Sequence, residues 1–174
     1  MMAMMVLSVV AGLLAAVTGH PWGIAPIAAA VVCAASVLRR REVWLVALGA
    51  MFLHDAILGF SSFTLVRLLA IAAVAGVVQW LRLMPRLMAV SVGVFVAAPL
   101  YQVILAVGDW ATHYCTPHPR TTEGLFATLS SAAPYMQRSL LSDLAFTTMF
   151  LALYTAIGFL LQRRWPRLLA ISRS

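Results

Sequence analysis

Residues 63–81 read FTLVRLLAIAAVAGVVQWL, and Arg67 is the only charged residue among them. A helix rises about 1.5 Å per residue, so this stretch reaches about 28 Å, close to the roughly 30 Å hydrocarbon core of a bilayer. No polar face repeats along it, as the solvated side of a surface helix would require. The stretch therefore predicts a transmembrane helix, and it sets the reading of the rest of the chain.

Other apolar runs of similar length lie on both sides of it. The chain has 174 residues, of which 63% are hydrophobic and only 10% are charged, whereas soluble domains carry about a quarter charged residues. We therefore expect an all-α integral membrane bundle of about six transmembrane helices in one domain, 1–174. The expected spans are 1–18, 23–38, 43–58, 63–81, 87–108 and 133–161.

The arginines predict the orientation of these spans. The net charge is +7, and all 12 basic residues are arginines, most of them beside the ends of apolar runs. With six spans, nine arginines fall on one side, whereas Arg120 is the only one in the connections on the other side. Arginine-rich connections stay in the cytoplasm. The sequence thus predicts a protein of the bacterial inner membrane with both termini on the cytoplasmic side. The basic residues are expected to interact with the bilayer and not with nucleic acid.

The connection between the fifth and sixth spans is unlike the others. Residues 109–132 begin with a polar, aromatic and proline-bearing segment and continue into a short apolar stretch that Ser130, Ser131 and Pro134 interrupt. Long connections in compact proteins often cover functional sites. We expect an outer loop that acts as a lid, followed by a half-helix at the membrane interface.

Charged residues inside the spans mark a candidate site. A charge at the centre of a span costs at least ~2.5 kcal/mol, so each one needs a partner or a watery cavity. Asp55, Arg67 and Asp143 are all expected in the outer half of the membrane, at similar depth. They indicate either an outward-facing ligand pocket or a structural ion-pair network. The predicted ligand-binding set is His54, Asp55, Arg67, Trp110, His113, Tyr135, Arg138 and Asp143.

Metal binding and catalysis have weaker support. His113 and His118 are five residues apart, which matches no fixed metal-site geometry, and Cys33 and Cys115 have no CxxC partner. GxSxG, HExxH and phosphate-binding glycine motifs do not occur. We expect no metal site, no cofactor and no enzyme activity.

Three segments resemble an uncharacterised family of small bacterial membrane proteins related to the substrate-binding S components of energy-coupling-factor (ECF) vitamin transporters. The segments are 19–29, the end of the third span at 54–59, and 121–147. The resemblance implies six helices, an outward-facing site for a vitamin, a vitamin precursor or a corrinoid, and a membrane coupling protein with separate ATPase subunits. Ala25 and His54 stand where the family favours asparagine and serine, so the ligand can differ.

Small residues on the first span fit such a partner. Ala11 and Ala15, and likewise Gly12 and Ala16, have the spacing that lets another helix approach closely. They are the predicted partner-binding residues, although internal packing would use the same spacing. The alternative function is a membrane scaffold of the rod-shape-determining MreD type, which would have a filled interior and a large partner-facing surface.

Overall fold

A computed structural model describes residues 27–164, and within this range the chain forms five α-helices and no strand. The all-α prediction is confirmed for this part, and the first expected span, 1–18, lies outside the described residues. Thr64–Leu81 and Leu87–Thr112 are both long and apolar enough to cross a membrane. The helices are α2 (Ile27–Val37), α3 (Arg40–Leu58), α4 (Thr64–Leu81), α5 (Arg86–Thr112) and α6 (Thr122–Arg164).

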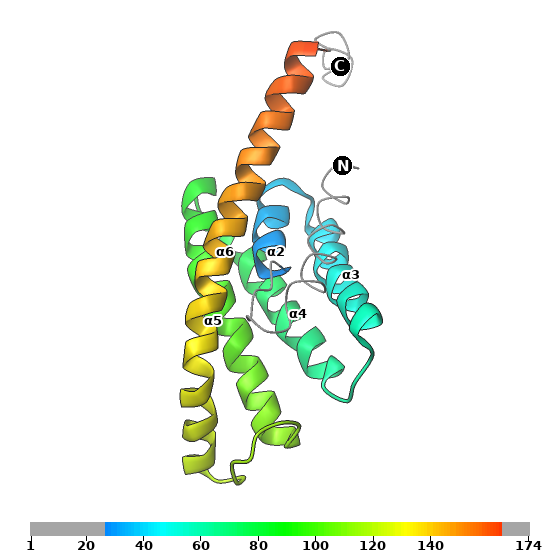
Figure 1. Cartoon of the computed structure of the whole chain (residues 1–174). Helices are drawn as coiled ribbons and strands as arrows, with labels where there is room; N and C mark the ends of the chain where they lie inside the picture. The colour runs from blue at the N-terminus through cyan, green and yellow to red at the C-terminus, as the bar shows by residue number, and fades with distance from the viewer. Residues whose placement is uncertain (1–26, 165–174) are drawn as a thin grey trace.

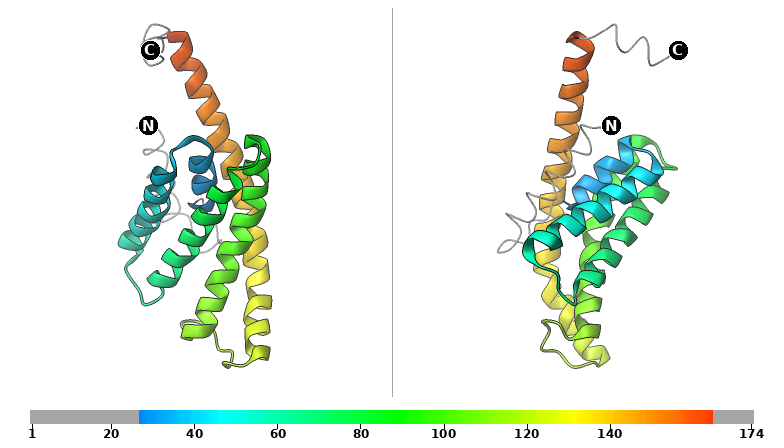
Figure 2. Two further views of the ribbon diagram at one scale, coloured as in Figure 1. Left: turned by 180° about the vertical axis from the view of Figure 1, so that it is seen from behind. Right: turned by 90° about the vertical axis from the view of Figure 1, so that its right-hand side faces the viewer.

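Successive helices run in opposite directions (Figure 1). The connections 38–39 and 82–85 lie at one end of the bundle, and 59–63 and 113–121 lie at the other end (Figure 2). The first end carries the arginines of residues 39–41 and Arg82, whereas Arg120 is in the connection 113–121 at the second end. The alternation that the sequence predicted for these spans is therefore present.

The short helix α2 lies among the other four and contacts each of them. Nine consecutive residues, 27–35, are buried, and five of them are alanines. Small side chains let neighbouring backbones approach closely, which is how membrane helices gain packing energy. The alanine spacing seen in this stretch of the sequence thus serves internal packing.

Polar bonds tie the arginine-bearing end together. The Arg82 guanidinium donates to the carbonyl of Leu38, and Nε2 of Gln79 donates to the carbonyl of Arg40 at 3.1 Å. The Leu38 carbonyl lies in the turn after α2, and the Arg40 carbonyl belongs to the first residue of α3. The end of α4 is therefore fixed to that turn, and Arg82 has a structural role as well as marking the orientation.

The two longest helices differ from the sequence prediction. α5 continues to Thr112 instead of ending near residue 108, and α6 begins at Thr122, so only 113–121 of the expected loop 109–132 is non-helical. The predicted half-helix is wrong, because it is the first part of α6. Pro134 removes one backbone bond, but α6 packs along α5 and continues through it.

α6 is much longer than a membrane span. Its 43 residues reach about 65 Å, roughly twice the hydrocarbon thickness. The C-terminal part of this helix stands clear of α2–α5 (Figures 1 and 2).

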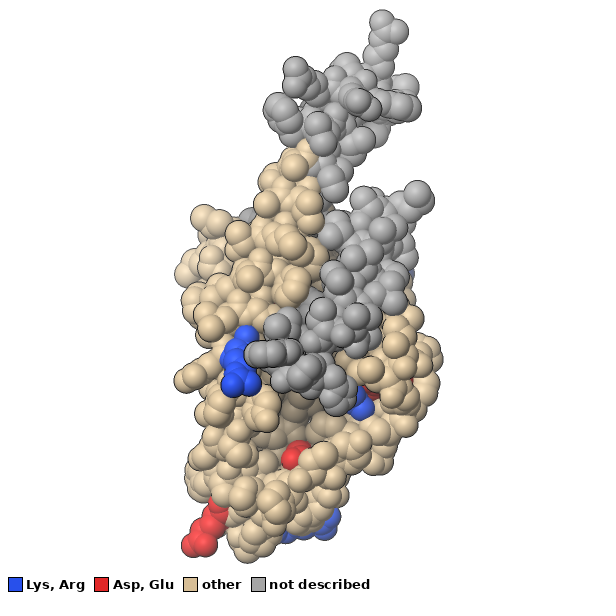
Figure 3. Space-filling model, in the orientation of Figure 1, with Lys and Arg blue, Asp and Glu red and all other residues tan. Residues whose placement is uncertain are grey.

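The outer surface of the helices is strongly apolar. Large side chains point outward from three successive helices, among them Phe52, Leu65, which is 71% exposed, and Phe95. Charged groups form only isolated spots on the face drawn in Figure 3, mostly toward the end where α5 and α6 are joined. A surface of this kind matches a hydrocarbon solvent better than water.

Candidate functional site

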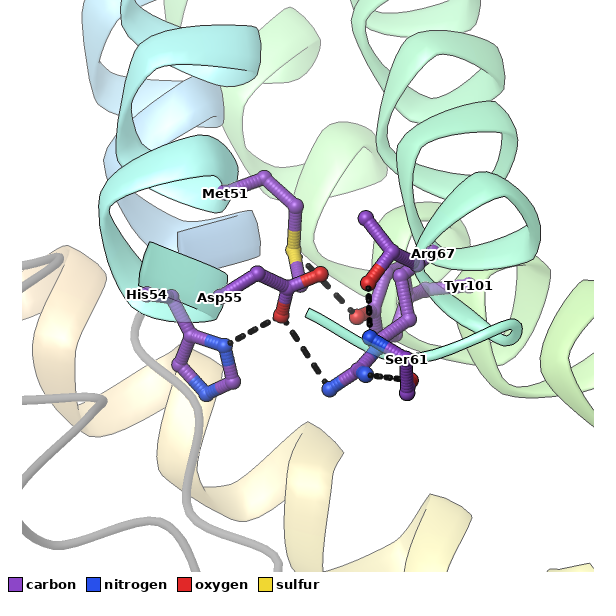
Figure 4. A network of polar contacts seen from close by, with 7 residues as sticks. Met51, His54, Asp55, Ser61, Arg67 and Tyr101 are labelled. Atoms are coloured by element: carbon purple, nitrogen blue, oxygen red, sulfur yellow. Dashed lines mark hydrogen bonds and ion pairs between the residues drawn. The ribbon is translucent and has the colours of Figure 1, made fainter. Parts of the chain in front are cut away.

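An ion pair joins α3 to α4 in the interior. Asp55 is fully buried, and its Oδ1 accepts from Nη1 of Arg67 at 3.1 Å and lies 3.0 Å from Nδ1 of His54 (Figure 4). Nη2 of Arg67 also donates to Oγ of Ser61 at 2.8 Å. Three residues of the predicted site are thus in direct contact.

The turn between these helices positions Arg67. Gly59 has a φ of 96°, a conformation that favours glycine, and it ends α3. The Ser61 N–H then donates to Oγ1 of Thr64 at 3.1 Å, and the Thr64 N–H donates back to the Ser61 carbonyl at 3.0 Å. These two bonds start α4 and hold Ser61 just before the helix, where its hydroxyl accepts from Arg67 six residues later.

The ion pair is not fully satisfied. Oδ2 of Asp55 and Nε of Arg67 are buried and have no hydrogen-bond partner in the described part of the chain. Such atoms are costly in a low-dielectric interior unless water or a ligand reaches them.

Asp143, at the midpoint of α6, does not join this pair. Its side chain is buried, and although it faces the backbone N–H of Ala29, neither carboxylate oxygen has a hydrogen bond of ordinary geometry within the described residues. Tyr101 of α5 lies beside this pair, close to Arg67 (Figure 4). The hydroxyl of Tyr101 contacts Sδ of Met51 at 3.8 Å (Figure 4).

A separate cavity of about 300 Å³ opens at the far end, between α5 and α6. Its walls come from the start of α4, the second half of α5, the connection 113–121 and the first part of α6. They combine aromatic rings, one carboxylate and several uncharged polar groups. The lining residues are Phe63, Gln102, Leu105, Ala106, Asp109, Tyr114, Cys115, Thr128, Ser131, Ala132 and Tyr135.

The connection 113–121 is held over this cavity by side chains at both ends. Nε1 of Trp110 donates to the carbonyl of Pro119 at 3.1 Å, and Oδ1 of Asp109 accepts from the N–H of Cys115 at 2.7 Å. Gly124 lets the connection turn closely over α6, since a Cβ there would lie 2.0 Å from the Pro119 oxygen. The connection is therefore braced to both helices.

Aromatic rings line one side of the opening. Phe63 and Tyr114 stack with centroids 5.1 Å apart and planes inclined by 13°. Tyr135 of α6, half exposed, is also on the lining. These rings offer faces to a planar or cationic ligand.

The structure separates the predicted ligand-binding residues. Only Tyr135 lines the cavity, while Trp110 braces the connection from outside the lining. His113 ends α5 with a left-handed φ of 52° and is exposed.

Arg138 is not brought to the cluster as the sequence prediction required. It is exposed, and the described residues give it no ion pair. At 3.6 residues per turn, a separation of five residues places it roughly 140° around α6 from Asp143. The partner-binding residues Ala11, Gly12, Ala15 and Ala16 lie outside the described residues.

Sequence reasoning missed most of the cavity. Gln102, Ala106 and Asp109 are spaced three to four residues apart on α5, so they share one helix face. A glutamine and an aspartate on one face of an apolar helix are the signal that was available, but ending the span at residue 108 separated Asp109 from it. Tyr101, which lies beside the ion pair, carried no such signal.

Both cysteines are free, Cys33 buried in α2 and Cys115 exposed on the cavity wall. Among residues 27–164, no three side chains of His, Cys, Asp and Glu gather where they could hold a metal ion.

Comparison with known proteins gives a family but no activity. Residues 1–168 match a family described as a family of unknown function (DUF6580), and because this match covers nearly the whole chain, the protein belongs to that family. No curated protein and no solved structure matches the chain. The resemblance to S components stays a prediction.

Proposed function

We propose that this member of a family of unknown function spans the bacterial inner membrane with six helices and captures a positively charged, vitamin-sized molecule from the outer side for uptake. The cavity under the connection between α5 and α6 carries the proposal. Its size, its lining and its position at the arginine-poor end each support one part of it.

The surface supports the membrane setting. α4 and α5 are apolar enough to span a bilayer, and less than half of each span is buried inside the protein. The remaining side chains, such as Leu65 and Leu69, would face lipid. The arginines at one end support a cytoplasmic position for that end under the positive-inside rule, and the cavity would then open outward.

The volume supports a small ligand. Ligand pockets usually measure about 300–1,000 Å³, and this cavity lies at the lower limit of that range. A corrinoid would need far more space. A single-ring or two-ring vitamin or precursor fits better.

The lining supports a positive charge. Asp109 supplies a carboxylate, and Phe63, Tyr114 and Tyr135 supply aromatic rings, whereas none of the described lining residues is Lys, Arg or His. Cations are attracted both to carboxylates and to ring faces, by about 0.5–2 kcal/mol for each ring. Gln102 and Ser131 add hydrogen-bonding groups that can orient a neutral part of the ligand.

The scaffold alternative has less support. A scaffold of the MreD type needs a filled interior, and an open cavity with a braced cover serves no purpose in it. The long C-terminal part of α6, which stands clear of α2–α5, is the one feature that would suit a partner-binding role (Figure 1).

Native mass spectrometry tests the proposal. The protein is extracted gently from its own membranes, and the spectrum is searched for a bound small molecule. We expect a cationic molecule that is lost in Asp109→Asn, which removes the carboxylate, and in Tyr135→Leu, which removes a ring. Glu123→Gln is the matched control, because Glu123 is an exposed acid on α6 that does not line the cavity.

Two results would contradict the proposal. A bound anion that survives in Asp109→Asn would place the ligand elsewhere. A bound membrane protein with no small molecule would favour the scaffold.

A further inference from the structure

One face of α6 is polar although it is buried. Ser139, Asp143 and Thr147 follow each other at intervals of four residues, so they lie on the same face. Their exposed fractions are 3%, 1% and 4%. This stripe begins one turn after Tyr135, the last α6 residue of the cavity lining, and none of its three residues lines the cavity.

The carboxylate in this stripe is unpartnered. Neither oxygen of Asp143 forms a hydrogen bond with the described residues, and Oγ1 of Thr147 and Oγ of Ser142 are also buried without partners. An ionised carboxylate in such surroundings costs several kcal/mol even after relaxation. The Ala29 N–H that the carboxylate faces offsets only part of this cost, so a bound positive charge would stabilise the packing described here.

The helices that pack against α6 supply no such charge. From α2 the titratable group is Cys33, whose thiol donates to the carbonyl of Thr147 at 3.8 Å, and from α5 it is Tyr101. Beyond Tyr101 lie Asp55, Arg67 and His54. The Arg67 guanidinium is already bound to Asp55 and Ser61, so it does not neutralise Asp143.

A proton suits this position better than a metal cation. Ser142 precedes Asp143 by one residue and is therefore rotated about 100° around α6. Its hydroxyl therefore lies off the face that carries the carboxylate, which leaves on that face one carboxylate and two hydroxyls, fewer oxygen ligands than a calcium or magnesium ion takes. A proton needs neither converging ligands nor added volume.

We propose that Asp143 is a proton-binding site within the membrane, through which the pH difference across the membrane acts on the protein. Release of this proton leaves an unpaired buried carboxylate, so it favours a different packing of α6 against α2 and α5. The role of that change in uptake rests on the proposed function, but the proton site itself does not.

Infrared difference spectroscopy of the full-length protein in liposomes, titrated from acidic to alkaline pH, tests the proton site. We expect a carbonyl band of a protonated carboxylic acid that is present at neutral pH, disappears at alkaline pH and shifts in heavy water. Asp143→Asn should remove the band, and Asp143→Glu should move it. Glu123→Gln should retain it, because Glu123 is an exposed acid on the same helix and lies outside the stripe.

Three results would overturn the assignment. They are the absence of the band at every pH in folded protein, a band that persists in Asp143→Asn, and a band that sodium ions suppress at constant pH. The measurement uses no ligand, so a failure to find a ligand by mass spectrometry would leave its outcome unaffected.

Discussion

Nη1 of Arg67 lies 3.1 Å from Oδ1 of Asp55, and this contact joins α4 to α3 through a carboxylate that is fully buried. The Arg67 side chain is 19% exposed, so the guanidinium is partly solvated whereas the Asp55 carboxylate is not. Removal of one partner leaves a buried charge on the other. The pair therefore controls the stability of this part of the bundle.

Asp55→Asn should destabilise the protein strongly. Breaking a buried ion pair from one side costs about 3–5 kcal/mol, because the remaining charge is unpaired. Unfolding in mixed detergent micelles, followed by circular dichroism, measures the change. In the double variant Asp55→Asn with Arg67→Gln, part of the loss should be recovered. Additive losses would contradict the pairing.

Asp143→Asn, in contrast to Asp55→Asn, should change the stability of the protein little. The amide has nearly the same shape as the carboxyl group and needs no bound proton, so we expect the free energy of unfolding to change by less than about 1 kcal/mol. The same unfolding assay measures it. A loss as large as that of Asp55→Asn would mean that Asp143 is ionised and paired.

Gly108→Ala should loosen the packing of α5 on α4. A Cβ at this position would lie 2.2 Å from Cγ1 of Val66, and the β-branched valine has little freedom to move. Overpacking of this kind costs about 1–3 kcal/mol. The second change Val66→Ala should restore the melting temperature, and a failure of this rescue would contradict the contact.

Gly124→Ala should open the cover of the cavity. The added Cβ would lie 2.0 Å from the backbone oxygen of Pro119, so the connection must move away from α6. We expect weaker ligand retention in native mass spectrometry with little change in the melting temperature. Gly76→Ala is the matched control, since the nearest atom to its Cβ would be 3.9 Å away, on Trp44. Equal loss in both variants would show a general defect.

Helix positions followed well from hydropathy where a span ended at charged or turn-forming residues. The expected span 63–81 agrees with α4, Thr64–Leu81, to within one residue. α3 begins three residues earlier than expected, at Arg40, because hydropathy excludes the arginines that form its first turn. The end of α5 was missed for the same reason, since Asp109 is polar but helical.

The candidate site was predicted only in part. The similar depth of Asp55 and Arg67 followed from counting residues along two spans, and they do make contact. The cavity could not be derived in this way, because its walls come from two helices, a helix start and a connection whose relative placement depends on packing. The separation of Arg138 from Asp143 was available from helical geometry alone.

Thiol labelling of Cys115 in intact cells tests the central claim most directly, because this exposed cysteine lies on the cavity wall while Cys33 is buried. Two membrane-impermeant methanethiosulfonates are compared, one carrying a trimethylammonium group and one a sulfonate, with rates normalised to those of a free thiol.

The account predicts labelling from outside, at least several-fold faster with the cationic reagent. Asp109→Asn should abolish that preference, and Cys115→Ser should abolish the labelling itself. Labelling only from the cytoplasmic side, or a preference for the anionic reagent, would contradict an outward-facing cavity for a cation.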